Sequence, residues 1–291
     1  MLHTNSYGGG ISQPIRKALS YAFDYDSFLT TVWNGRAVRA GGVLSTLCAF
    51  YNASIPQAYY NLTIAKQVLV DAGLAGVKNL GMANTTEEWR TVADSGDPIA
   101  SVDIVYNVGD ETFGTLQSAL NDIGCKAIGT SSPNLWLNYV STGFIVVQDA
   151  FPFTWPNNWW DPYPFLRVYF DTDSAYHIVA GSGLYDPLLD EYITQIYFGN
   201  ETVKQHYYNL FADRIQNFHY PWLFIGQYIS GWAAGIEWNA KYYNFMPYYA
   251  GFEFNEELSV YQPIPGFPVF SIILYSFVTV IFVVLTLRKR K

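Results

Sequence analysis

The fold is decided by one stretch of sequence, which reads VDIVYNV (102–108), TFGTLQSALNDI (112–123), CKAI (125–128), PNLWLNYV (133–140) and FIVV (144–147). The first, third and fifth segments are short apolar runs, typical of buried strands. The second and fourth have the apolar spacing of helices, and Gly124 ends the longer one. This β-α-β-α-β order predicts a three-layer α/β/α domain, in which helices cover both faces of a mainly parallel sheet.

Polar residues with short side chains mark the starts of further helices on both sides of this stretch. Upstream, we expect helices that begin after Ser12, Asp24 and Asn61, each capped by that side chain. Downstream, we expect one helix to open at Asp186 and the next to open at Asn200 and run to about residue 218. The remaining aromatic-rich segment, 219–262, has no clear period, and we interpret it as short strands and loops.

The composition excludes several classes of protein. The 291 residues include 24 acidic and 16 basic side chains, so the formal net charge is −8. Half of the residues are hydrophobic and 18% are aromatic, which does not fit a disordered or coiled-coil chain. The acidic balance argues against nucleic acid as a partner, because such proteins carry a basic surface.

One segment near the C-terminus is long enough to cross a membrane. Phe267 to Leu287 contains no charged residue, and as a helix it would span about 31 Å. Arg288, Lys289, Arg290 and Lys291 follow it, which places that end in the cytoplasm and the rest of the chain outside. The alternative is a buried core helix, although such a helix needs neither so long an uncharged run nor a basic end.

An exported chain needs a signal peptide, and residues 1–30 do not resemble one. We therefore expect either that the true N-terminus is missing or that the chain is a fragment. An extracellular setting fits the Asn-x-Ser/Thr sequons, which lie at Asn52, Asn61, Asn84 and Asn200. In that setting Cys48 and Cys125 either form a disulfide bond or remain two separate buried thiols.

The most unusual stretch is the loop FPFTWPNNWWDPY (151–163), which follows the last predicted strand. In open α/β sheets, ligands bind beyond the carboxyl ends of the strands. The loop combines aromatic faces for stacking with a few polar anchors, which is the usual make-up of a small-molecule site. The candidate ligand-binding residues are Trp155, Asn158, Trp159, Trp160 and Asp161. For Trp159 and Trp160, packing in a hydrophobic corner of the domain is an equally good interpretation.

Motifs for catalysis and for cofactor binding are absent from the sequence. It contains no nucleotide-binding glycine loop, no HExxH, no CxxC and no Gly-x-Ser-x-Gly, and its four histidines lack metal-ligand spacing. We therefore predict no cofactor, no metal site and no enzymatic activity. A glycosidase that uses Asp149 and Asp161 as its carboxylate pair remains an alternative.

Four segments together resemble the extracellular solute-binding proteins of family 5, the oligopeptide, dipeptide and nickel group that serves ABC importers. The two specific ones are IRKALSYAFDYD (15–26) and YNLTIAKQVLVDAG (60–73). The weaker ones, YDPLLD (185–190) and YPWLF (220–224), follow in the family's order. The resemblance covers nearly all of 11–255, but it corresponds only to the C-terminal half of a family chain.

The resemblance implies a periplasmic-binding-protein-like fold of type II, in which two lobes close on a small-molecule ligand, here with the N-terminal lobe missing. Peptide binders of the family place a Trp, and three residues later an Asp, beside the amino terminus of the ligand. Trp155 and Asn158 stand at those positions here, and Asn lacks the charge that would pair with an ammonium group. A C-terminal membrane anchor looks archaeal within this family.

The sequence therefore predicts a membrane-anchored solute-binding protein that delivers an oligopeptide or oligosaccharide to ABC permease subunits. The alternatives are a cell-surface carbohydrate-binding protein or hydrolase, and a purely structural surface protein. The expected organisation, along the chain, is a disordered start (1–10), the α/β lobe (11–221), part of a second lobe that returns across the hinge (222–262), a stiff spacer (263–266), the transmembrane helix (267–287) and a cytoplasmic tail (288–291).

Overall fold

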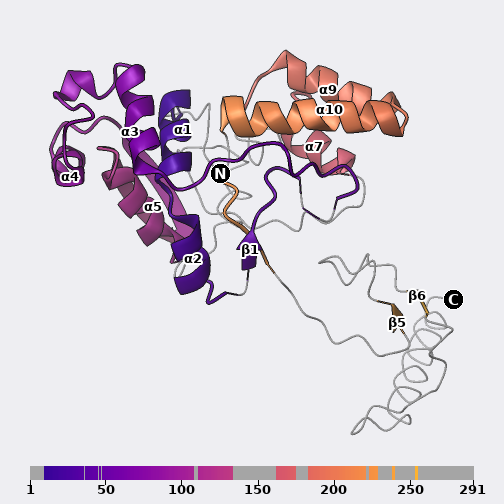
Figure 1. Cartoon of the computed structure of the whole chain (residues 1–291), viewed down its shortest axis with the longest axis horizontal. Coiled ribbons are helices and arrows are strands. Elements are labelled where there is room, and N and C mark those ends of the chain that lie inside the picture. The colour runs from indigo at the N-terminus through magenta and orange to yellow at the C-terminus, as the bar shows by residue number, and fades with distance from the viewer. Residues whose placement is uncertain are drawn as a thin grey trace, which may run out of the picture. The chain divides into compact units, whose positions relative to one another are not determined.

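The chain divides into two units, residues 1–230 and residues 231–291. The computed structural model describes residues 10–35, 37–44, 46, 48–107, 111–133, 162–174, 183–220, 223–228, 238–239 and 253–254. In the second unit, these are two short antiparallel strands, β5 (Trp238–Asn239) and β6 (Glu253–Phe254). The first unit holds the elements that bear on function (Figure 1).

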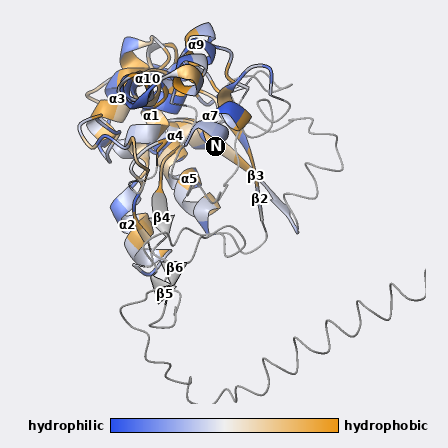
Figure 2. Ribbon diagram, turned by 90° about the vertical axis from the view of Figure 1, so that its right-hand side faces the viewer, coloured by the Kyte–Doolittle hydropathy of each residue, from blue (hydrophilic) through white to orange (hydrophobic). Residues whose placement is uncertain are grey.

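Helices dominate the described part of the first unit. They are α1 (Gln13–Ala22), α2 (Tyr25–Thr31), α3 (Leu62–Asp71), the 3₁₀ turn η1 (Gly76–Lys78), α4 (Thr86–Asp94), α5 (Thr112–Asn121), α7 (Tyr163–Phe170), α9 (Pro187–Phe198), α10 (Glu201–Asp213) and the π-helical turn η2 (Arg214–His219). Their ribbons alternate between hydrophilic and hydrophobic colours (Figure 2), as expected of helices that bury one face.

The strands β2 (Ser101–Asn107) and β3 (Lys126–Ser132) form a parallel pair, joined by α5. The register places Ser101 opposite Lys126 and Asn107 opposite Ser132. This β-α-β unit confirms the parallel pairing of the first two predicted strands. Helices cover the face of β2 that carries the buried Val102 and Ile104. The layer on the other face of the sheet stays a prediction.

The first core lies between this sheet and the helices α1 to α5, and its buried side chains come from residues 11–127. Alanines line the contact between α1 and α3, where Ala18 and Ala65 have no exposed surface. Small side chains let two helices approach closely, and α1 and α3 make the most extensive helix–helix contact of the described chain.

The second core is helical and is built from α7, α9, α10 and η2, together with the segment from Val43 to Ile55. Its largest fully buried side chains are aromatic and include Phe170, Tyr208 and Phe211. The rings of Phe170 and Phe211 pack edge to face, 5.3 Å apart between centroids. In Figure 1, α9 and α10 lie side by side, as expected of helices joined by only two residues.

Helices begin where the sequence predicts at all five positions, and the residue at four of them forms a capping bond, whereas the cap predicted at Ser12 is wrong. Asp24, Asn61, Asp186 and Asn200 each accept a backbone hydrogen bond from the first turn of the helix that follows. Ser12 lies at the start of α1 in an extended conformation, but its side chain makes no capping bond. Pro14 within the first turn sets the backbone for α1 without that bond.

Three elements differ from the sequence-based expectations. β3 extends to Ser132, four residues past the apolar run, because its polar residues complete the ladder with β2. The helices α4 and α7 were not predicted. α4 begins with a full capping box between Thr85 and Glu88. α7 follows directly on the aromatic loop, and it carries Pro164 in its first turn.

Several predictions fall on residues outside the described ranges. These are the disordered start, the helix 133–140, the strand 144–147, the spacer and the transmembrane segment 267–287. Within the described ranges, no helix has both the length and the hydropathy needed to cross a bilayer.

Candidate functional site

The predicted ligand loop connects the two cores. β3 ends at Ser132 beside the first core, and α7 begins at Tyr163 with Phe165 and Leu166 buried in the second core. The chain between these elements contains all five candidate binding residues, Trp155, Asn158, Trp159, Trp160 and Asp161. They lie outside the described residues, as does Asp149, so their roles stay predictions. The described structure shows how the two ends of the connection are anchored.

The parallel pair places the carboxyl ends of β2 and β3 at one edge of the sheet, where Asn107 lies opposite Ser132. At this edge the ring of Tyr106 stacks on Phe113, with centroids 4.4 Å apart and an interplanar angle of 7°. Phe113 also lies against Gly129, where a Cβ atom would come within 2.3 Å of the ring. The stacked rings of Tyr106 and Phe113 therefore pack at the sheet edge where β3 ends and the chain continues toward the ligand loop.

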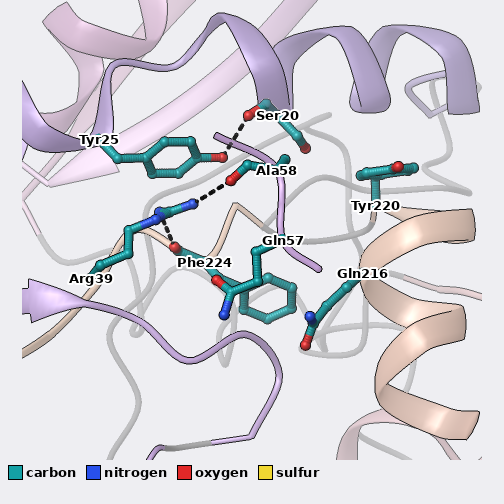
Figure 3. A pocket seen from close by; sticks show the side chains of 8 residues that line it. All are labelled: Ser20, Tyr25, Arg39, Gln57, Ala58, Gln216, Tyr220 and Phe224. Carbon is teal, nitrogen blue, oxygen red and sulfur yellow. Dashed lines mark hydrogen bonds between the residues drawn. The ribbon is translucent and has the colours of Figure 1, made fainter. Parts of the chain in front are cut away.

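A small polar pocket lies where segments from both cores meet (Figure 3). Arg39 is its centre: the guanidinium lies over the Tyr25 ring, 3.1 Å from Cζ to the centroid. Its nitrogens donate to the carbonyl oxygens of Ala58 and Phe224, and more weakly to that of Ile225. Burial lowers the pKa of Arg39, and the neighbouring Tyr25 opposes this shift. One side chain thus ties together three segments that are distant in sequence.

Gln216 forms the other wall of this pocket. Its Oε1 accepts a hydrogen bond from the backbone N–H of Val43 at 3.1 Å. Gly42 has a φ of +96°, and a Cβ there would lie 2.0 Å from the Gln216 side chain, so only glycine fits. The free volume is about 10 Å³, close to the room that one water molecule needs. The pocket is too small for a peptide or a metal chelate, and we assign it a structural role.

Asp186, Arg214 and His219 form a buried polar cluster beside the second core. The Asp186 carboxylate accepts from Arg214 Nε, lies 2.5 Å from His219 Nε2, and caps α9 through Leu188 N. Burial opposes ionisation of Asp186, but the bonds from Arg214 and His219 outweigh it and lower its pKa. Burial also lowers the pKa of His219, more than Asp186 raises it. Near neutral pH, His219 is therefore a neutral donor to an ionised Asp186.

Arg16 joins this cluster to the first core. It is buried in α1, and its Nε and Nη2 donate to the backbone oxygen of His219 at 3.0 and 2.8 Å. Burial lowers the pKa of Arg16 to about 10, so it stays charged at neutral pH. Sequence reasoning missed Arg16, Arg39 and the Asp186 cluster as structural residues. Arg16 and Arg39 bind groups 203 and 185 residues away, and the partners of Asp186 are 28 and 33 residues away. Separations of this size leave no local pattern in the sequence.

The described residues contain no group of three or more His, Cys, Asp or Glu side chains that is arranged to hold a metal ion. The Asp171 carboxylate accepts from Asp173 N and pairs with Arg167. Cys48 and Cys125 are separate buried thiols, which decides between the two alternatives left open by the sequence. Burial raises the pKa of Cys125 to about 12, so this thiol is protonated and unreactive at neutral pH.

The fold is shared with solved structures of binding proteins. NikZ from Campylobacter jejuni, in complex with Ni(L-His), has a TM-score of 0.61 at 20% identity; the match covers 78% of this chain and 44% of NikZ. DppA from Helicobacter pylori, in complex with the peptide STSA, has a TM-score of 0.61 at 17% identity, covering 77% of this chain and 40% of DppA. AppA from Bacillus subtilis, in complex with a nonapeptide, has a TM-score of 0.56 at 18% identity, covering 74% and 41%.

These identities establish the fold alone, and the chain spans less than half the length of each of these proteins. No curated protein matches the sequence. A family model does: the one described as bacterial extracellular solute-binding proteins, family 5 Middle, matches residues 12–177, which is more than half of the chain. That range includes both specific segments, 15–26 and 60–73, and the β-α-β unit. The chain therefore belongs to the extracellular solute-binding proteins of family 5.

Proposed function

We propose that this chain is the solute-capturing component of an ABC importer, and that its solute is a peptide or a metal–amino acid complex. The family match over residues 12–177 carries this proposal. Proteins of the same fold have been solved with the peptide STSA, with a nonapeptide and with Ni(L-His). Such a protein works by binding and release without bond chemistry, in line with membership of a binding-protein family rather than an enzyme family.

The proposed binding surface is the loop from Trp155 to Asp161. Two observations support it: the carboxyl ends of β2 and β3 share one edge of the sheet, and the loop connects that edge to the second core. Trp155 supplies a stacking face, whereas Asn158 supplies a neutral amide in place of the family's carboxylate. We therefore expect weak selection for a free amino terminus. Asp161 is the carboxylate nearest in sequence that can replace it.

The second wall of the site would come from a further lobe. Relatives of known structure are more than twice as long as the matched part of this chain. A cleft between lobes needs both walls, so we expect residues 1–265 alone to bind solute poorly.

Attachment to the membrane completes the proposal. Phe267–Leu287 would span the bilayer, with Arg288–Lys291 in the cytoplasm and residues 1–265 outside. Proteinase added to intact cells should remove the ectodomain and leave a fragment of a few kilodaltons in the membrane. Full protection of residues 1–265 would contradict this topology.

Solute uptake tests the proposed function. Cells that lack this chain should take up less of a labelled tetrapeptide, or less ⁶³Ni supplied with histidine, than cells that contain it. Restoring the chain should restore uptake. Unchanged uptake of both solutes, in cells where the chain is normally produced, would overturn the assignment.

The same assay tests the binding loop. Trp155→Ala should weaken binding by about 1–3 kcal/mol, which is what removal of a large apolar contact costs, and uptake at low solute concentration should fall accordingly. The control is Trp136→Ala, in the predicted helix 133–140. Asn158→Asp should favour peptides with a free amino terminus. If Trp155→Ala and Trp136→Ala behave alike, the solute site lies elsewhere.

A further inference from the structure

The four sequons differ sharply in how the structure presents their asparagines. Asn200 is exposed, as is Thr202 two residues later, whereas Asn52, Asn61 and Asn84 are half-buried. The Oδ1 atom of Asn200 caps α10 by accepting from Val203 N at 3.1 Å. Its Nδ2, the atom that carries an N-linked glycan, donates no hydrogen bond within the described structure. Modification of Nδ2 therefore leaves the cap in place.

Two of the other sequons use their side-chain amide within the fold. Asn52 donates through Nδ2 to Asn209 Oδ1 at 3.2 Å. Asn84 accepts from Gly81 N, and its amide also interacts with the Glu88 carboxylate. A glycan on either would disturb these contacts. Asn61 caps α3 from a half-buried position where its backbone N–H donates to Tyr21 O of α1. Asn200 is thus the sequon that best accommodates a bulky substituent.

An exposed aromatic residue, Phe198, lies two positions before Asn200 in the chain. Phe198 ends α9 with 79% of its surface exposed, the most of any large hydrophobic residue in the described chain. The chain is closely packed at Gly199, because a Cβ there would lie 2.6 Å from the Val203 side chain and 2.7 Å from Gln195 O. Gly199 alone separates Phe198 from Asn200 in the chain, and the Phe198 ring packs edge to face on Tyr197, with the centroids 4.7 Å apart. The apolar face of a pyranose ring attached at Asn200 can pack on that ring.

The sequon at Asn52 provides an internal comparison. It too has a phenylalanine two residues earlier, but the Phe50 ring stacks on Tyr208 at 4.7 Å, in the second core. That ring is already covered by protein. A phenylalanine two residues before the asparagine is thus exposed at Asn200 and covered at Asn52. Only the tertiary structure distinguishes the two sequons.

We propose that Asn200 is an N-glycosylation site whose first sugar packs on Phe198. The donor class is an oligosaccharide carried on a lipid phosphate or pyrophosphate. Asn200 Nδ2 forms a bond to the anomeric carbon, the bond from that carbon to the phosphate oxygen breaks, and the lipid phosphate leaves with the electron pair. The amide gives up one proton to a base of the transferase. This modification requires the proposed extracellular placement of residues 1–265.

Glycopeptide mapping of the full chain, isolated from its native cells, tests occupancy. Asn200 should carry a glycan at higher occupancy than Asn52 or Asn84. Asn200→Asp keeps an oxygen cap for α10 and should abolish the modification there, and Thr202→Ala should do so with Asn200 intact. Thr202→Ser keeps the sequon and should retain the glycan. If proteinase removes residues 1–265 from intact cells but Asn200 carries no glycan, the proposed glycosylation site is wrong. The topology and the uptake function would not be affected by that result.

A double-mutant comparison tests the role of Phe198. In the otherwise native chain, Asn200→Asp should lower Tm by about 2–4 °C, because the packed sugar is lost while the cap remains. In a Phe198→Ala background, the same substitution should change Tm by less than about 1 °C. Equal decreases in both backgrounds would show that the sugar does not use the Phe198 ring.

Discussion

The two cores of the first unit differ in the elements that they pack together and in the side chains between their helices. The first core places small residues, such as Ala18 and Ala65, between helices that pack on a parallel β-α-β unit. The second core has no described strand inside it and fills the space between helices with large rings, such as Tyr208 and Phe211. The first core also buries large rings, among them Trp89, Phe23 and Phe28. The cores therefore differ in the small residues between α1 and α3, whereas both contain large side chains that are costly to remove.

The cores also differ in how they hold buried charge. In the first core Lys66 donates to the Thr86 hydroxyl and lies over the Trp89 ring, and the buried Asp122 is paired with one donor, Arg90. Beside the second core, Asp186 is held by Arg214 and His219. A buried carboxylate with two donors is stable only while those donors remain. The second core should therefore be sensitive to loss of either donor and to acid.

The largest effect should come from Phe211→Ala. The ring is fully buried against Phe170, so its removal should lower the free energy of unfolding by about 3–5 kcal/mol. Urea denaturation of the full chain, followed by circular dichroism, measures this loss. Phe211→Leu, which keeps most of the volume, should cost less than about 1.5 kcal/mol. Similar losses for both variants would mean that ring packing does not dominate the second core.

Removal of the Asp186 carboxylate should have the next largest effect. Asp186→Ala strands the Arg214 and His219 donors and removes the α9 cap, so it should destabilise the chain by about 2–3 kcal/mol. Asp71→Ala, at an exposed carboxylate of α3, should change stability by less than about 0.5 kcal/mol. Equal effects in the same denaturation assay would contradict a structural role for the cluster.

Acid should weaken the second core through His219. Its pKa is lowered from 6.5 in the folded chain, so below pH 6.5 the unfolded chain binds a proton that the folded chain resists. The contribution to stability is full above pH 6.5 and is lost as the pH falls through the lower, folded pKa. Asp186 acts in the same direction below its ordinary value of 3.8. The slope from one such group is at most about 1.4 kcal/mol per pH unit.

Denaturation midpoints between pH 7.5 and 4.5 measure this dependence. His219→Gln keeps a donor toward Asp186 but does not titrate, so its midpoint should vary less with pH than that of the native chain. An identical pH dependence in both proteins would assign the acid sensitivity to other groups.

The smallest expected loss of stability comes from removing a helix cap, and it should occur at Asn61 but not at Ser12. Asn61 accepts from Ile64 N at 3.1 Å, so Asn61→Ala should cost about 1 kcal/mol. Ser12 makes no capping bond, so Ser12→Ala should be close to neutral. Thermal melts of the two variants check this difference within the first core. A loss at Ser12 as large as that at Asn61 would show that the Ser12 cap forms in solution.

Local sequence patterns account for most elements of the first core, although α4 was not predicted. Apolar periodicity and capping residues act within about one turn of helix, so α2, α3 and α5 could be read from the chain, and the order of β2, α5 and β3 implied their parallel pairing. The family could also be recognised from 15–26 and 60–73, and the family match bears this out. The candidate site could be placed only by the rule for open sheets, so its residues stay predictions.

The tertiary structure alone decided the contacts that join the cores. Arg16 meets His219 across 203 residues, and Arg39 meets Phe224 across 185. No periodicity links such positions, because their proximity depends on how complete helices and strands pack. The same reason applies to the sequons: all four look alike in sequence, yet only packing shows that Phe50 is covered by Tyr208 while Phe198 is open. Burial is a property of the assembled fold, and a local pattern does not contain it.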